Sequence, residues 1–195
     1  MAARLLLRTW GLRQLRSLAR ESEAVRRCWS VIERMPAGLL SQPLRMTLGK
    51  IMYVRLKRAM RVQPEHPFLV QQQLQIARFI GSSMGGRRGE ITRAAREDAL
   101  QALGEFLELL DESRRADILR EEEMLRCRER VIAARASLQL DHFRQAAIQA
   151  ECLRQMPQAI SYLRDALKSA ESLQDRRAYR EIREHLHDLE TAAGF

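Results

Sequence analysis

The spacing of apolar residues limits this chain to helices. No stretch shows the sustained alternation of apolar and polar residues that a half-buried strand requires. Between Ser41 and Val62, the apolar residues fall on one arc when successive residues are turned by about 100°. The chain has only 9 glycines and 5 prolines, and strong helix formers outnumber β-branched residues. The pattern predicts an all-α protein, an irregular helical bundle of about six to seven helices.

Breaks between these helices are predicted from turn residues and caps. Ser41 and Thr92 are suited to N-cap a helix, and Gly81 is suited to C-cap one. A further break is expected near Asp111–Ser113, with the next helix ending near Ala136. The expected helices cover about 1–34, 41–62, 68–80, 92–110, 113–136 and 173–190, together with a helical hairpin in 140–173.

The chain divides into four segments by composition. We expect a basic N-terminal helix or arm in 1–35 and a basic amphipathic helical segment in 36–81. A glycine-rich linker follows in 82–91, and it is interpreted as a boundary between subdomains. Residues 92–195 are expected to form a helical bundle that includes the hairpin.

Positive charge is concentrated at the front of the sequence. Residues 1–60 carry 13 basic and 3 acidic side chains, whereas the chain as a whole carries 34 and 25. Such asymmetry indicates an anionic partner, either nucleic acid or an anionic membrane surface. Four side chains on the polar arc of the helix at 41–62 are the candidate contacts: Lys50, Lys57, Arg58 and Arg61. The alternative is a helix that docks on a core and leaves its charges in water.

The first twenty residues admit two interpretations. They are rich in arginine, contain no acid before Glu21 and are loosely amphipathic, so they resemble a mitochondrial presequence. The alternative is an ordinary N-terminal helix of a bacterial cytoplasmic protein, which is the localisation we favour. A presequence would place the mature protein in the mitochondrial matrix. No run approaches the eighteen or so apolar residues that a membrane span needs.

Residues 140–173 carry small and large apolar residues at the spacing of a helix–turn–helix. The positions are Phe143, Ala146, Ala147 and Ala150 in the first helix and Ala159, Leu163 and Ala166 in the second, with Tyr162 in the string Gln158–Leu167. This segment resembles a single tetratricopeptide repeat. The resemblance covers about one sixth of the chain, and it departs from the family at positions 147, 150 and 171. It implies an antiparallel hairpin that offers a surface to a protein partner.

Residues typical of catalysis or metal binding form no recognisable constellation. Glu181 and His185 are four apart on a helix, but a surface ion pair is the simpler interpretation, and no metal or cofactor is expected. Cys28, Cys127 and Cys152 are too far apart for a zinc motif, and the last two are expected to be buried thiols. Ile118, Leu125 and Ile132 recur every seven residues, which indicates packing within a bundle.

These observations favour a non-catalytic helical adaptor that binds a protein partner through its C-terminal hairpins. The alternative is a protein whose basic N-terminal half binds nucleic acid or an anionic membrane. A helical enzyme with an unrecognised site is the third hypothesis.

Overall fold

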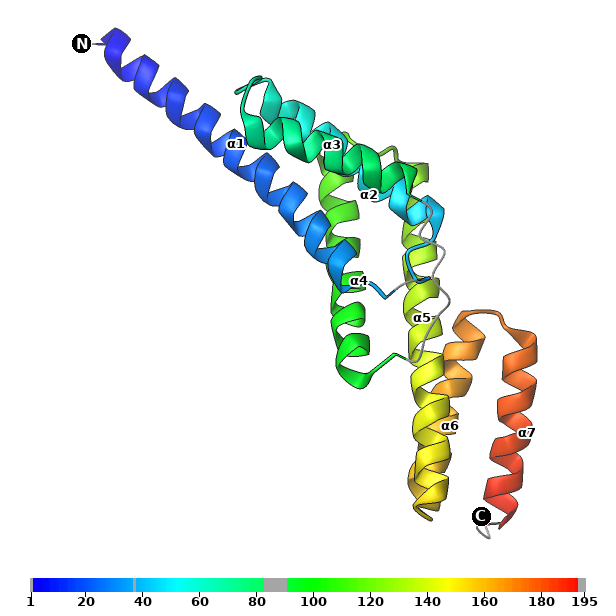
Figure 1. Ribbon diagram of the computed structural model, residues 1–195. Helices are drawn as coiled ribbons and strands as arrows, with labels where there is room; N and C mark the ends of the chain where they lie inside the picture. Colours follow the sequence, from blue (N-terminus) through cyan, green and yellow to red (C-terminus); the bar gives the residue numbers. More distant parts are fainter. Residues whose placement is uncertain (1, 37, 83–90, 193–195) are drawn as a thin grey trace. The chain divides into compact units, whose positions relative to one another are not determined.

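The computed structural model describes residues 2–36, 38–82 and 91–192, with side chains from residue 11 onward. These residues form seven helices and no strand, which confirms the predicted all-α class. The helices are α1 (Ala2–Arg34), α2 (Gln42–Met60), α3 (Pro67–Gly81), α4 (Arg93–Arg115), α5 (Glu121–Cys152), α6 (Met156–Ser172) and α7 (Arg176–Ala192), as Figure 1 shows.

The chain folds into two compact units, and the division falls inside α5. Unit 1 comprises residues 1–128, and unit 2 comprises residues 129–195. The residues that flank the predicted linker belong to the same unit, and positions 83–90 of that linker lie outside the described residues. Unit 1 carries 24 basic and 15 acidic side chains, whereas unit 2 carries 10 of each. The whole net charge of +9 therefore belongs to unit 1.

In unit 1, α1 packs against both α2 and α4, and α3 packs against α2 (Figure 1). The apolar arc predicted for α2 is buried, and its inner positions meet apolar side chains of the neighbouring helices. Fully buried core residues include Val31 of α1, Leu44, Leu48, Ile51 and Met52 of α2, and Leu103 and Phe106 of α4. Gly49 allows α2 and α3 to approach closely, because a Cβ there would lie 2.5 Å from Cγ1 of Ile80.

One ion pair lies inside this core. Nη1 of Arg55 on α2 donates to Oε2 of Glu21 on α1 at 3.0 Å, and both side chains are about nine-tenths buried. A second polar contact joins α1 to α3, where Nε1 of Trp29 donates to Oε1 of Gln72 at 2.8 Å. The Trp29 ring also meets the Phe79 ring edge to face, with 5.7 Å between centroids. Specific polar contacts therefore fix α1 against its neighbours.

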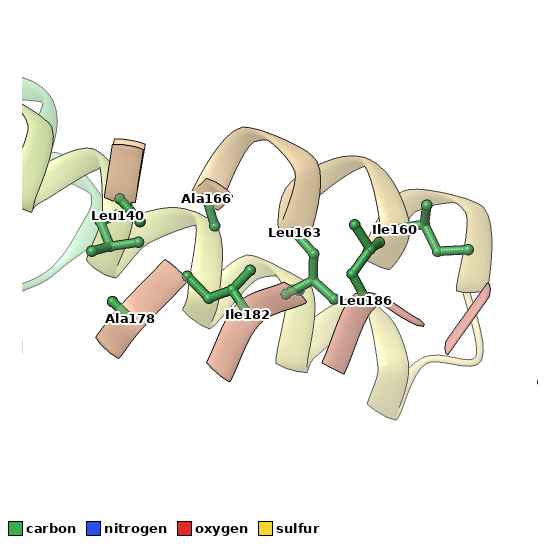
Figure 2. Close-up of a cluster of buried hydrophobic side chains, with 9 residues drawn as sticks. Leu140, Ile160, Leu163, Ala166, Ala178, Ile182 and Leu186 are labelled. Carbon is green, nitrogen blue, oxygen red and sulfur yellow. The ribbon is translucent and has the colours of Figure 1, made fainter. Parts of the chain in front are cut away.

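The core of unit 2 is made by α6, α7 and the part of α5 that belongs to this unit (Figure 2). Leu163 of α6 lies beside Ile182 and Leu186 of α7, while Leu140 of α5 lies near Ala178. The buried alanines of this cluster let the helix backbones approach each other, and the larger side chains fill the remaining space. An antiparallel α6–α7 pair thus packs on α5.

Three helix ends share one turn in which the left-handed residue is not glycine. The residues are Asp117 after α4, Arg154 after α5 and Gln174 after α6, with φ of 52°, 58° and 54°. At the last of these, the Gln174 N–H donates to the Glu171 carbonyl and the Asp175 N–H to the Ala170 carbonyl. This is the Schellman pattern. Asp175 then caps α7, because its Oδ1 accepts from the N–H groups of Arg177 and Ala178.

Replacing Gln174 by glycine is expected to stabilise unit 2 by about 0.5–1 kcal/mol, because glycine adopts the left-handed conformation without a Cβ penalty. Chemical denaturation of the Gln174→Gly variant measures this gain. Gln158, an exposed residue in the first turn of α6, offers the control. Gln158→Gly is expected to lose stability, and a loss for both variants would contradict the role given to Gln174.

The predicted caps are confirmed in part. Ser41 precedes α2 at its N-cap position, although its side chain makes no capping hydrogen bond. Thr92 caps α4 and accepts from the Ala95 N–H at 3.3 Å. The C-cap predicted at Gly81 is wrong, because Gly81 is the last residue of α3 and extended Ser82 follows it. An extended cap residue needs no glycine.

Two predictions for the middle of the chain are also wrong. The break expected near Asp111–Ser113 occurs after Arg115 instead, and α5 then continues without interruption past Ala136. The seven-residue series is only partly buried: Ile118 is in the core, but Leu125 and Ile132 are each 48% exposed. Met124, Cys127 and Val131 occupy the buried face of α5 instead.

Candidate interaction surfaces

The four cations predicted on α2 do not form one free surface. Nζ of Lys50 donates to both carboxylate oxygens of Glu123, at 2.9 and 2.7 Å. This hydrogen bond, followed by that from the Arg120 backbone N–H, holds the pKa of Glu123 below its usual value. Nη2 of Arg58 donates to the Ala116 carbonyl at 2.8 Å. Lys50 and Arg58 therefore connect α2 to the elements beside it.

The other two cations of α2 remain available to solvent. Lys57 is exposed, and its Nζ lies 4.9 Å from the centroid of the Tyr53 ring, which is a cation–π contact. Arg61 follows the end of α2 and is exposed. Since only Lys57 and Arg61 are free in this way, the predicted anionic-partner surface on α2 has at most half of its proposed charge.

The acidic edge of α4 neutralises part of α1. Nη1 of Arg27 donates to Oε1 of Glu112 at 2.7 Å, and its Nη2 donates to Oε2 of Glu108 at 3.1 Å. The hydrogen bond to Glu112 is the main cause of the raised pKa of Arg27. Arg34 lies about two turns further along the same side of α1 and pairs with Glu105. Sequence reasoning missed these pairs because the partners are 71 to 85 positions apart.

An arginine-lined cavity of about 350 Å³ lies among α1, α2 and α4. Its lining includes Arg20, Arg27, Arg55 and Arg115 together with the carboxylates of Glu23 and Glu112. Arg27 and Arg55 already form the ion pairs described above. Arg20 and Arg115 form no ion pair with the described residues, so they are the cations that this cavity offers to an anion.

A further group of exposed cations of unit 1 lies on α1. Arg13, Arg16 and Arg20 are exposed and pair with no acid among the described residues. Leu12 and Leu15 beside them are 54% and 56% exposed. The helix runs without a break from this part of the chain into the core residues after Glu21. The described part of the segment that the sequence assigned to targeting or a mobile arm therefore carries exposed cations.

The residues predicted for the hairpin surface are brought together, but most of them face inward. Ala147, Ala150, Ala159, Leu163 and Ala166 are all buried, none more than 3% exposed. Phe143 and Tyr162 are half-buried and pack against the same cluster. Their packing holds α5, α6 and α7 together. Five of the seven predicted side chains are therefore inaccessible to a partner of the folded protein, whereas Phe143 and Tyr162 are partly accessible.

The exposed side chains that accompany this hairpin lie at the end of α5. Ile148 is 57% exposed and Leu153 is 68% exposed, with Cys152 exposed between them. Polar pairs border this region. Arg144 meets Glu181 at 3.4 Å, and Oε1 of Glu151 lies 3.1 Å from Nε2 of His185. We name Ile148, Cys152 and Leu153 the α5 end patch.

Glu181 and His185, the pair considered for a metal, each contact a different side chain. Glu181 pairs with Arg177 and Arg144, and the hydrogen bond from Arg177 is the first cause of its lowered pKa. His185 lies against Glu151 instead. In the described part of the chain, no three His, Cys, Asp or Glu side chains come together as a metal-binding group.

The three thiols differ in exposure. Cys28 and Cys127 are buried, whereas Cys152 is exposed, so the prediction that Cys152 is buried is wrong. Burial raises the pKa of the Cys28 thiol to about 12, against the weaker opposite effect of Arg55 and Arg27. Its thiolate, the reactive form, is therefore rare at neutral pH.

One thiol of the three is expected to react quickly with an aromatic disulfide reagent near pH 8 in the folded protein. The other two should react only after denaturation. Absorbance of the released thiolate measures both steps, and Cys152→Ser should remove the fast one. A fast step that survives this substitution would contradict the burial of Cys28 and Cys127.

No helix among the described residues is long and apolar enough to cross a membrane. Comparison with known proteins gives no match: no family model, curated protein or solved structure is similar to this chain at a significant level.

Proposed function

We propose that the protein is a non-catalytic helical adaptor that binds a protein partner through unit 2. The observation that carries this proposal is the α5 end patch. The core cluster of unit 2 is formed by side chains of α5, α6 and α7, and Ile148 and Leu153 remain largely exposed outside it. Aliphatic side chains that the fold itself does not cover can be buried by a partner.

Two further features support a protein as the ligand of unit 2. Residues 140–173 resemble a tetratricopeptide unit, and stacked units of this kind bind proteins through their exposed helix faces. In addition, the 10 basic and 10 acidic side chains of unit 2 leave it without net charge. A neutral surface attracts anionic polymers poorly, so apolar contact with a protein suits it better.

The test uses the full chain with Ile148→Glu and Leu153→Glu combined. Both positions are exposed, so the charges should leave the fold intact, which circular dichroism checks. The affinity for the partner captured by the wild-type chain is expected to fall at least about tenfold in this variant, since each glutamate would have to be buried on binding. Met46→Glu is the matched control in unit 1, because Met46 is 48% exposed. Equal capture by all three proteins would contradict the proposal.

A second candidate function is binding of an anionic surface by unit 1, either nucleic acid or membrane. It is favoured by the +9 charge of this unit and by the unpaired Arg13, Arg16 and Arg20 on α1. Binding to DNA and to anionic vesicles at about 50 mM salt tests it, because screening is weak there. Changing these three arginines to glutamine should reduce binding, whereas negligible binding to both ligands by the wild-type chain would contradict it.

A further inference from the structure

Helix α3 has a second apolar face that the described residues of the chain leave exposed. Leu69, Ile76 and Phe79 form the buried face toward α1 and α2. On another side of the helix, Val70 is 42% exposed and Leu74 is 59% exposed, and Ala77 and Gly81 are exposed as well. We name Val70, Leu74, Ala77 and Gly81 the α3 seam. Their spacing of four, three and four is that of a coiled-coil contact stripe.

Among the described residues, no contact requires the two small residues of the seam to be small. A Cβ added to Gly81 would meet no atom within 4 Å. Gly81 is the last residue of α3 and does not have the positive φ that would favour glycine. Ala77 is exposed too, so no neighbouring element limits its size. A close contact with another molecule would explain both residues.

The polar residues around the seam indicate what kind of molecule would make this close contact. Arg78 is the only charged residue among the 15 of α3. The seam is flanked by Gln71 and Gln75, and an amide both donates and accepts hydrogen bonds. A two-fold interface places the same surface on both sides, so it needs groups that complement themselves. A face with one cation, no anion and several glutamines meets that need.

We propose that α3 is a dimerisation helix, and that its seam pairs antiparallel with the seam of a second copy. The seam runs from large to small side chains, from Val70 and Leu74 to Ala77 and Gly81. In antiparallel pairing, Val70 lies opposite Gly81 and Leu74 opposite Ala77, so each large residue meets a small one. Parallel pairing would instead place Gly81 against Gly81 and leave a void there.

The same register also accommodates the one charge. When position 70 faces position 81 of the second copy, Arg78 lies on the same flank of the interface as Gln71 of that copy, whose amide oxygen can accept from the guanidinium. The two arginines then lie on opposite sides of the two-fold axis.

Sedimentation of the full chain at up to about 200 μM tests dimer formation, because this concentration range detects dissociation constants in the micromolar range. The wild-type chain is expected to dimerise, and Leu74→Glu should raise the dissociation constant at least about tenfold. Ile132→Glu is the control, since Ile132 is 48% exposed and lies in unit 2 outside the α5 end patch. Its dissociation constant should stay within about twofold of the wild-type value.

Disulfide trapping tests the antiparallel register in a Cys152→Ser background, which removes the exposed native thiol. A mixture of Val70→Cys and Gly81→Cys chains should form a crosslinked dimer. Each variant alone should not, because eleven residues of helix separate equivalent positions by about 16 Å, beyond the reach of a disulfide. A monomeric wild-type chain, a Leu74→Glu chain that still dimerises fully, or crosslinking of Val70→Cys with itself would each overturn the proposal.

Discussion

Replacing Arg55 by leucine is expected to lower the free energy of unfolding of unit 1 by about 3–5 kcal/mol. The substitution leaves the carboxylate of Glu21 buried without the guanidinium that pairs with it at 3.0 Å. A charge that has lost both water and its partner is among the most costly groups in a protein interior. Urea denaturation followed by tryptophan fluorescence measures the loss, because Trp10 and Trp29 both belong to unit 1.

The double variant Glu21→Leu with Arg55→Leu separates two free energies. One is the cost of leaving a buried charge unpaired, and the other is the net contribution of the ion pair to stability. It is expected to regain most of the stability, because two apolar side chains of similar volume can replace a buried ion pair. Arg13→Leu serves as the control, since Arg13 is exposed and unpaired among the described residues. If Arg55→Leu were no more destabilising than Arg13→Leu, the buried ion pair would not exist in solution.

Leu163→Ala is the second substitution with a large expected effect, a loss of about 2–5 kcal/mol in unit 2. Leu163 is 2% exposed and packs among Ile182, Leu186 and the small residues of α5 and α6. Truncation would leave a cavity at the centre of the three helices, and alanines around it have no long side chains with which to fill it. Amide hydrogen exchange in α6 and α7 should accelerate accordingly.

Its neighbour provides a matched control. Arg164 is mostly exposed and pairs with Glu190 at 2.7 Å, so Arg164→Ala should cost no more than about 1 kcal/mol. Unchanged exchange in Leu163→Ala would show that the cluster in Figure 2 does not hold α6 and α7 in place.

Local periodicity predicted the helices and much of the core. The apolar arc of α2 was correct because six of its members, Leu44, Leu48, Ile51, Met52, Leu56 and Ala59, are spaced for one helix face and are all buried. The small residues at Ala147, Ala159 and Ala166 were likewise correct as contacts between packed helices. Their availability to a partner could not be judged, because the same residue type suits a core and a binding groove.

Other features depend on contacts that a single sequence does not display. The end of α4 was misplaced because its turn uses Asp117 in the left-handed region, where glycine would have given a clear signal. On α5, Leu125 and Met124 differ by one position, and only the neighbouring helices decide which is buried.

The charge asymmetry is the clearest such case. In the structure, Arg27, Arg34 and Lys50 each pair with an acid more than seventy positions away, which the order of residues does not reveal.

Site-specific photocrosslinking of the full chain tests most directly whether the partner binds unit 2. A photoreactive residue is placed at position 148 or 153 in unit 2, and at position 16 or 61 in unit 1 for comparison. All four positions are exposed, so reactivity depends on what binds there. The proposed function predicts one protein adduct at positions 148 and 153 and none of it at 16 and 61. Adducts formed only at 16 and 61, and above all to nucleic acid or lipid, would contradict it.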